Sequence, residues 1–348
     1  MLKLSILAVL VSATVVSATS ALADLAAVRE TTIPAPLHGH DLQIAVYYPT
    51  TNSAEKQIFA ENPVFQGVTV AVGDSVILPP EGGGYPVILM SHGLGGNYRS
   101  LAWLAKGLAE QGAIVVAVNH PNSTTGDFDM QAGLLHWTRA KDMTLALDWL
   151  LATPDFGPMA DAGDVHVAGF SYGGWTALSL IGVRGDLPGY IAHCAAYGAR
   201  SSHCADIARA GANLATLDAD LWGADYSDPR VQSVMAIEPG LTFGQTPAAV
   251  AGVKGNILLV ALGQGEDRLP ATDISAAGSN LVGLLPDADV LEIAPARHFS
   301  MLPLCKPAGA AILAEEKDDP VCTDPEGADR AAIHAQVLAA AVRFFGLG

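Results

Sequence analysis

The stretch that most constrains this chain runs from residue 165 to residue 180. A short apolar run leads into Gly-Phe-Ser-Tyr-Gly at 169–173, and helix-forming residues follow directly. This order of strand, sharp turn and helix is what a nucleophile elbow requires. Gly169 and Gly173 flank Ser171 because only small neighbours fit at such a strained corner. We therefore expect the Ser171 hydroxyl to stand clear of the sheet, with the amino end of the next helix facing any negative charge that develops there.

Apolar runs and helical patterns alternate around this turn. Pro86–Met90, Ala113–Val118 and Asp164–Phe170 are typical of strands buried on both faces. Strands that alternate with helices predict an α/β chain with a mainly parallel, doubly wound sheet. Sites in such sheets lie at the carboxyl ends of the strands. An early antiparallel strand is expected at 42–49, further strands at 68–72, 231–237, 256–262 and 290–293, and helices around 101–112, 143–150 and 329–345.

Residues 184–230 interrupt the alternation. They contain Cys194, Cys204 and several aromatic side chains. We interpret this segment as an insertion over the site, a lid held by a disulfide, and an ordinary surface excursion is the alternative. The expected organisation is one α/β domain over 24–348 that carries this lid-like insertion.

The first 23 residues differ in kind from the rest. Lys3 precedes the apolar stretch Leu4–Val16, and Ala21-Leu22-Ala23 fits a small-residue cleavage site. This pattern predicts a signal peptide over 1–23 and export to the periplasm or the extracellular space. An N-terminal anchor helix is the alternative, but the Ser and Thr content and the cleavage-like end favour removal.

Charge and cysteine usage limit the partners of the chain. A net charge of −17 opposes contact with nucleic acid and with anionic membranes, so we expect neither a nucleic-acid partner nor stable membrane association. The cysteines fall into two local pairs, Cys194 with Cys204 and Cys305 with Cys322, and short loop closure favours these pairings. No Cys-x-x-Cys or histidine-rich cluster points to a metal, and no cofactor is expected.

Acyl transfer by a serine needs a base, an acid that orients the base, and two donors for the oxyanion. In this topology the order along the chain is Ser, acid, His. His298 follows the last strand and is the predicted base. His92 and His120 also lie at strand ends, but they precede Ser171, so we expect structural or pocket roles for them. The other histidines lie before the core, in a strand, in helical stretches or in the insertion: His38, His40, His136, His166, His193, His203 and His334.

Two residues compete for the role of the acid. Glu238 ends the apolar strand 231–237, where an unpaired buried carboxylate would cost several kcal/mol. Asp267 follows the next strand, which is the commoner position for this acid. Its loop carries several charges, however, and an exposed surface turn without a catalytic role has the same composition. We predict Glu238, because an acid that ends an apolar strand needs a partner, and keep Asp267 as the alternative.

The sequence also indicates which backbone amides could bind the oxyanion. Ser-His-Gly-Leu-Gly-Gly at 91–96 comes directly after a buried strand, where a glycine-rich backbone can turn its amides inward. One donor is expected from this loop and one from the residue after the nucleophile. We assign them to the amides of Leu94 and Tyr172.

The motifs at 91–96 and 169–174, together with the His298-Phe299-Ser300 loop, resemble the platelet-activating-factor acetylhydrolase family and its bacterial dienelactone-hydrolase-like relatives. The similarity covers most of 40–348. It implies an α/β-hydrolase fold and a calcium-independent serine esterase, with the acid at Glu238 and the oxyanion donors at Leu94 and Tyr172. Two features depart from that family: the acid is Glu instead of Asp, and the 184–230 insertion lengthens the gap between nucleophile and acid.

Together these patterns predict an exported serine hydrolase of small-molecule carboxylic esters that works through an acyl-enzyme and prefers short acyl chains. A non-catalytic binding protein on the same scaffold is one alternative. A lactone or dienelactone hydrolase is another, although enzymes most like dienelactone hydrolase use a cysteine nucleophile where this chain has Ser171.

Overall fold

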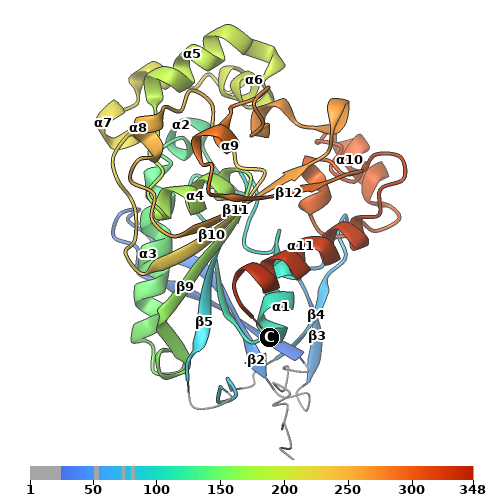
Figure 1. Cartoon of the computed structure of the whole chain (residues 1–348). Coiled ribbons are helices and arrows are strands. Elements are labelled where there is room, and N and C mark those ends of the chain that lie inside the picture. Colours follow the sequence, from blue (N-terminus) through green and yellow to red (C-terminus); the bar gives the residue numbers. More distant parts are fainter. Residues whose placement is uncertain (1–24, 51–54, 73–74, 80–82, 348) are drawn as a thin grey trace, which may run out of the picture.

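The computed structural model describes residues 25–50, 55–72, 75–79 and 83–347. The predicted signal peptide and its cleavage site lie outside the described residues. In the part that is described, ten strands form one sheet in the order β12-β11-β10-β9-β5-β6-β2-β1-β4-β3, with helices on both faces (Figure 1).

The elements of the sheet and its covering helices have the following bounds. The strands are β1 Leu25–Ile33, β2 Leu42–Thr50, β3 Lys56–Phe59, β4 Val68–Ala71, β5 Tyr85–Ser91, β6 Ile114–Val118, β9 Ala160–Phe170, β10 Val231–Ile237, β11 Asn256–Leu262 and β12 Asp289–Ile293, with a small hairpin of β7 Ser123–Thr124 and β8 Asp127–Phe128. The helices are α1 Ala102–Glu110, α2 Met130–Gly133, α3 Trp137–Ala152, α4 Tyr172–Leu180, α5 Leu187–Tyr197, α6 Ser202–Arg209, α7 Ala219–Trp222, α8 Pro247–Val250, α9 Leu281–Leu284, α10 Gly309–Glu316 and α11 Arg330–Phe344.

The mainly parallel sheet that the alternation predicts is confirmed. β5 pairs in parallel with β6 and β9, and β9 to β12 continue in parallel. The strand expected at 42–49 is β2, which is antiparallel to both β1 and β6. β1, β3 and α10 were not predicted. β1 pairs with β2 along its whole length, from Leu25 opposite Thr50 to Ile33 opposite Leu42.

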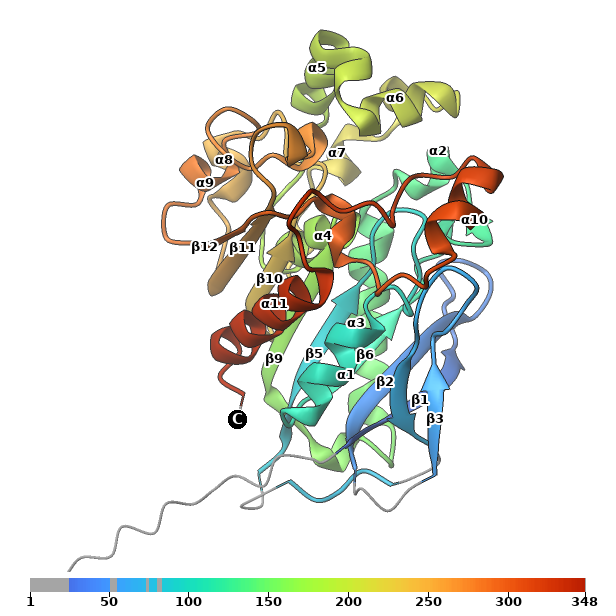
Figure 2. The same cartoon turned by 90° about the vertical axis from the view of Figure 1, so that its right-hand side faces the viewer.

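Side chains that alternate along each central strand enter two separate cores. Val87 and Leu89 of β5 pack with α3 and α4 on one face, whereas Ile88 and Met90 pack with α1 and α11 on the other. Burial on both faces explains why these strands read as continuous apolar runs. Figure 2 shows α1 and α11 together on one side of the sheet.

The segment 184–230 folds into α5, α6 and α7, which Figure 1 shows beyond α4 at the carboxyl edge of the sheet. Cys194 of α5 and Cys204 of α6 form a disulfide, as expected from their spacing. The segment rests on the loop after β10, where the backbone of Gly189 meets that of Gly244 so closely that no Cβ would fit. The insertion is therefore packed against the core and not detached from it.

The strand order fixes where loops converge. The chain goes from β5 to β6 on one side and later returns to β9 on the other side of β5. Loops that leave the carboxyl ends of β5 and β9 therefore meet at the switch point, where sheets of this kind bind ligands.

Candidate active site

Ser171 stands at a strained turn between β9 and α4. Its backbone has φ +57° and ψ −118°, outside the regions that side chains ordinarily favour. A Cβ at Gly169 would lie 2.0 Å from the carbonyl oxygen of Gly173, and a Cβ at Gly173 would lie 2.0 Å from the carbonyl oxygen of Ser91. Both glycines are thus required by close backbone approach, as the Gly-x-Ser-x-Gly pattern indicates.

His298 lies within hydrogen-bond distance of Ser171 and is nearly buried, at 7% exposure. Its Nε2 is 3.1 Å from Ser171 Oγ, and its Nδ1 is 3.2 Å from Glu238 Oε2. The carboxylate can only accept, so Nδ1 carries the proton and donates it to Glu238. Nε2 is then free to accept from the serine hydroxyl, while the ring packs 4.6 Å from that of Phe170.

Glu238 is 1% exposed, and its carboxylate accepts hydrogen bonds from three groups. Oε1 accepts from the amide of Leu262 at 2.7 Å, and Oε2 accepts from Thr272 Oγ1 at 2.8 Å in addition to His298. These donors hold the carboxylate in one orientation. The contribution of Thr272 was not predicted, because a lone threonine in a loop gives no sequence signal.

The structure places Asp267 near this group but does not bring it to His298. Its carboxylate instead accepts from Arg297 Nη2 at 2.6 Å, and the two side chains are 36% and 35% exposed. Asp267 therefore lies in a surface ion pair one residue away from the histidine.

The two residues expected to supply the oxyanion donors adjoin Ser171, Tyr172 along the chain and Leu94 through its neighbour Gly93. Tyr172 is the first residue of α4, so its amide points out of the helix start. Gly93, which precedes Leu94, lies so close to the nucleophile that a Cβ there would be 3.2 Å from the Cβ of Ser171. Within the described part of the chain, neither amide donates to a backbone or side-chain acceptor. Both amides are thus left without an acceptor in this part of the chain, as a donor kept for a ligand would be.

The turn that carries His298 is held from its far side. His298–Met301 forms one turn of 3-10 helix, in which Ser300 is completely buried. The hydroxyl of Ser300 donates to Asp324 at 2.6 Å, and its carbonyl oxygen accepts from His334 Nε2 at 2.9 Å. The position of His298 therefore depends on contacts with the C-terminal segment, which sequence patterns did not reveal.

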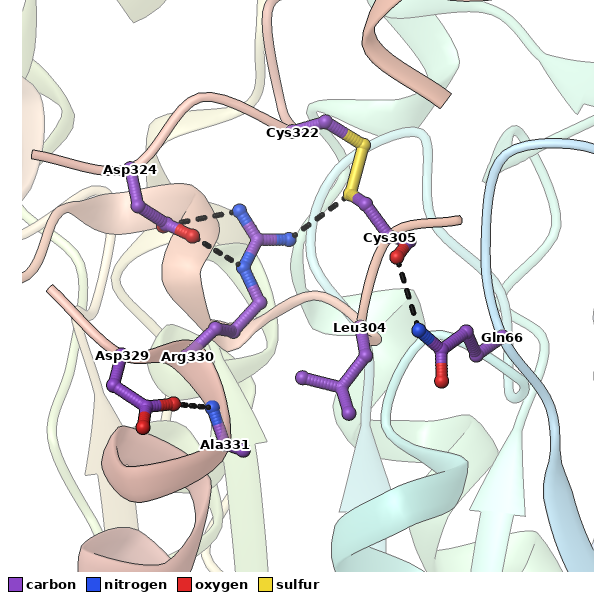
Figure 3. Close-up of a pocket in the computed structure, with 8 residues that line it drawn as sticks. All are labelled: Gln66, Leu304, Cys305, Cys322, Asp324, Asp329, Arg330 and Ala331. Carbon is purple, nitrogen blue, oxygen red and sulfur yellow. Dashed lines mark hydrogen bonds and ion pairs between the residues drawn. A yellow bond between two sulfur atoms is a disulfide. The ribbon is translucent and has the colours of Figure 1, made fainter. Parts of the chain in front are cut away.

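Arg330 links this support to the second disulfide, as Figure 3 shows. Its guanidinium makes two hydrogen bonds to Asp324 and a third to the carbonyl oxygen of Pro303, and it lies 3.5 Å from Cys305 Sγ. Cys305 and Cys322 are bonded, as their spacing suggested. Burial alone would raise the pKa of Asp324, but hydrogen bonds from Arg330 and Ser300, together with the charges of Arg330 and Arg297, outweigh it and lower the pKa below its usual value. Asp324 is therefore ionised at neutral pH.

Opening this disulfide should weaken the base. We expect the Cys305→Ser/Cys322→Ser variant to lose about tenfold in kcat, because small displacements of a catalytic group are costly. The matched Cys194→Ser/Cys204→Ser variant opens the insertion instead and should leave the pH profile of the histidine unchanged. Kinetics and melting curves of both variants, with peptide mapping of the wild-type pairings, test this expectation. Free thiols or crossed pairs in the mapped protein would contradict it.

His92 and His120 lie beneath the loop after β5 and contact neither Ser171 nor His298. His120 Nε2 is 2.9 Å from Ser91 Oγ and its Nδ1 is 3.0 Å from Asp142, while His92 Nδ1 donates to the carbonyl oxygen of Gly93. Neither histidine belongs to the hydrogen-bonded series of Ser171, His298 and Glu238. Among the described residues, no group of His, Cys, Asp and Glu side chains is arranged to hold a metal ion.

Part of the chain is similar in sequence to known hydrolases. A family model described as X-Pro dipeptidyl-peptidase (S15 family) matches residues 67–223. Cutinase est1 of Thermobifida alba is 32% identical over 117 residues, which are 33% of this chain and 36% of the relative. The chain thus spans about a third of the length of the curated relatives that it matches.

Solved structures match over nearly the whole chain. A ferulic acid esterase from Streptomyces cinnamoneus covers 94% of this chain and is itself covered to 91%, with a TM-score of 0.58 and 18% identity. A dienelactone hydrolase-like promiscuous phosphotriesterase, P91 from metagenomic libraries, covers 93% of this chain and is covered to 100%, with a TM-score of 0.50 and 13% identity. At such identities the likeness concerns the fold. With its central parallel sheet, flanking helices and strand order, the chain has the α/β-hydrolase fold.

Proposed function

We propose that this chain is a serine hydrolase of carboxylic esters in which Ser171, His298 and Glu238 form the catalytic triad. The observation that carries the proposal is the continuous hydrogen-bonded series from Ser171 Oγ through both ring nitrogens of His298 to the buried Glu238 carboxylate. The Ser, acid, His order along the chain is the order typical of this fold. The cutinase and the ferulic acid esterase among the similar proteins support an ester as the substrate.

The geometry supports a two-step mechanism. Ser171 Oγ attacks the ester carbonyl while His298 Nε2 takes the hydroxyl proton, and Glu238 stabilises the imidazolium. The amides of Leu94 and Tyr172 bind the oxyanion of the tetrahedral intermediate. His298 returns the proton to the leaving alcohol, which leaves an acyl-enzyme on Ser171. A water molecule, activated by the same histidine, then releases the acid.

The surroundings support a small-molecule ester as the substrate. In the described part of the chain, no helix combines the length and apolarity that a membrane span needs. The net charge of −17 opposes nucleic acid as a partner. The two disulfides support export, which the apolar segment at 1–23 also predicts. We propose that the insertion 184–230 acts as a lid, because α5 and α6 lie over the edge that carries the elbow (Figure 1).

Labelling with a fluorophosphonate and turnover of p-nitrophenyl esters by the mature protein test the proposal. Labelling at Ser171 together with ester turnover is expected. A protein that is neither labelled nor active would be the non-catalytic binding protein instead. A parallel assay with a lactone tests the lactonase alternative, which the dienelactone hydrolase-like neighbour fits in part. An assay with an X-Pro p-nitroanilide tests the peptidase activity named by the family model. Faster turnover of either than of the esters would overturn the ester assignment.

Short acyl chains should be preferred over long ones. The insertion brings His203, whose Nδ1 is 2.5 Å from the hydroxyl of Tyr190, to a ring-centroid distance of 6.5 Å from Tyr172, next to the nucleophile. Because this aromatic group of the insertion packs next to the nucleophile, we expect it to hinder long acyl chains. A chain-length series of p-nitrophenyl esters should show higher kcat/KM for acetate and butyrate than for decanoate or longer.

The same series bears on the resemblance to platelet-activating-factor acetylhydrolases. A short-chain preference agrees with removal of an acetyl group from a lipid, so a phospholipid with a short acyl chain is a further substrate to assay. Faster turnover of long-chain esters or of phospholipid vesicles than of acetate or butyrate esters would contradict the short-chain prediction.

A further inference from the structure

Arg139 of α3 is a buried cation that the triad does not use. It is 1% exposed, and its guanidinium ends between the loop after β5 and the first turns of α4. It donates to the carbonyl oxygen of His92, to Ser91 Oγ at 3.1 Å, to Ser123 Oγ at 2.6 Å and to Thr176 Oγ1 at 3.1 Å. All these acceptors are uncharged, and no ion pair between described residues includes Arg139, although the nearby carboxylate of Asp142 acts on its charge through space. Burying such a cation is unfavourable, so its retention calls for a role.

The partners of Arg139 lead to both proposed oxyanion donors. His92, whose carbonyl oxygen Arg139 binds, donates through Nδ1 to the carbonyl oxygen of Gly93 at 2.7 Å. That carbonyl belongs to the same planar peptide unit as the Leu94 amide, so fixing its oxygen also fixes the direction of the N–H. On the other side, the guanidinium carbon lies 4.6 Å from the centroid of the Tyr172 ring.

The charges in this group are well defined. Burial lowers the pKa of Arg139 to about 10, against the opposing effects of Tyr172 and of the Asp142 carboxylate, so Arg139 stays protonated at neutral pH. Burial, and then the charge of Arg139, lower the pKa of His92 to about 3, so its ring stays neutral. His92 Nε2 accepts from the amide of His120 at 3.2 Å, which assigns the ring proton to Nδ1. A fixed positive charge thus lies against the loop that carries the Leu94 amide and against the side chain of Tyr172.

We propose that Arg139 is a positioning residue of the oxyanion site: it ties the Leu94 loop to the start of α4 and favours negative charge on the carbonyl oxygen of the substrate. The inference rests on the proposed function and adds to it a residue that acts through the two amides. It makes its contribution in the transition state, because the oxygen is charged there and nearly neutral in the bound ester.

The test compares Arg139→Gln, Arg139→Lys and the control Arg230→Gln. Arg230 also forms an ion pair, with the buried carboxylate of Asp228. It lies just before the amino end of β10, at the opposite edge of the sheet from the site. For Arg139→Gln we expect kcat to fall about a hundredfold with KM nearly unchanged, as for loss of an oxyanion donor. Arg139→Lys retains the charge and should recover part of the loss. Arg230→Gln should keep its activity.

A pair of inhibitors separates positioning from a merely structural role. A trifluoromethyl ketone forms a tetrahedral oxyanion on Ser171, whereas the corresponding methyl ketone binds mainly as the neutral ketone. Arg139→Gln should weaken binding of the first by about as much as kcat falls, and binding of the second little. The acidic limb of the kcat/KM profile, which reports on His298, should not move.

The outcomes distinguish the two proposals. Equal weakening of both ketones, a raised KM with unchanged kcat, or a Lys variant no better than the Gln variant would overturn the role of Arg139 while the wild type remains an esterase. If Arg139→Gln does not fold, the Arg139→Lys variant decides. Wild-type kcat at a lower melting temperature would support a role for the positive charge. Equally weakened binding of both ketones would overturn that role. A wild-type protein without labelling or turnover would instead overturn the proposed function itself.

Discussion

Ser171→Ala should lower kcat for ester hydrolysis by at least about a thousandfold. The hydroxyl lies 3.1 Å from His298 Nε2, and removing it takes away the atom that would form the acyl-enzyme. The fold should be retained, since alanine is smaller than serine and has the same backbone preferences at this turn. Initial rates with p-nitrophenyl butyrate and a thermal melt measure both effects.

Ser179→Ala is the matched control for this change. Ser179 lies on the same helix, is 1% exposed, and its hydroxyl has no hydrogen-bond partner among the described residues. Its removal should leave the rate near that of the wild type. A Ser171→Ala protein that keeps more than about a tenth of the activity would rule out the triad, because residual catalysis without a nucleophile is far smaller.

Glu238→Gln should lower kcat by about a thousandfold, since the amide favours the wrong tautomer of His298 and stabilises the imidazolium poorly. The hydrogen-bond donors around the carboxylate give a second reason to expect a large loss. Leu262 N–H, Thr272 Oγ1–H and His298 Nδ1–H all donate to the carboxylate, so the NH₂ group of a glutamine must face one of these donors. Steady-state kinetics over a range of pH values measure the loss.

Asp267→Asn is the companion change and should alter the rate by less than about threefold, because an exposed ion pair contributes little. Its partner, Arg297, would lose a contact that is about one-third exposed. The reverse pattern, with a large loss at Asp267 and a small one at Glu238, would move the acid to Asp267. Comparable losses at both would call for the double variant, whose non-additivity would show whether they act as one unit.

Much of the fold could be predicted because it depends on local constraints. A strand buried on both faces must be apolar at every position, and this pattern located β5, β6, β10 and β11. β3 and α10 could not be predicted, because short and half-exposed elements show no clear periodicity of apolar residues. β1 takes its place through complete pairing with β2, which is a property of two segments and not of one.

The site divides in the same way. The sequence by itself determined the elbow, since glycines on both sides of Ser171 and a strand-to-helix change are visible within ten residues. It also limited the base to a histidine after the last strand. The acid is different, because Glu238 and Asp267 both follow strands that end at the same edge, and chain order alone does not separate them.

Only the tertiary structure decided which acid meets the histidine. His298 lies 60 residues from Glu238 and 127 residues from Ser171 along the chain, so their contact depends on how β9, β10 and the last loop are arranged side by side. The same holds for Arg139, whose partners come from three other segments. Steric constraints act between residues that are neighbours in the chain, so the sequence shows them directly. Hydrogen bonds between distant segments form only after the sheet has set the position and register of each strand.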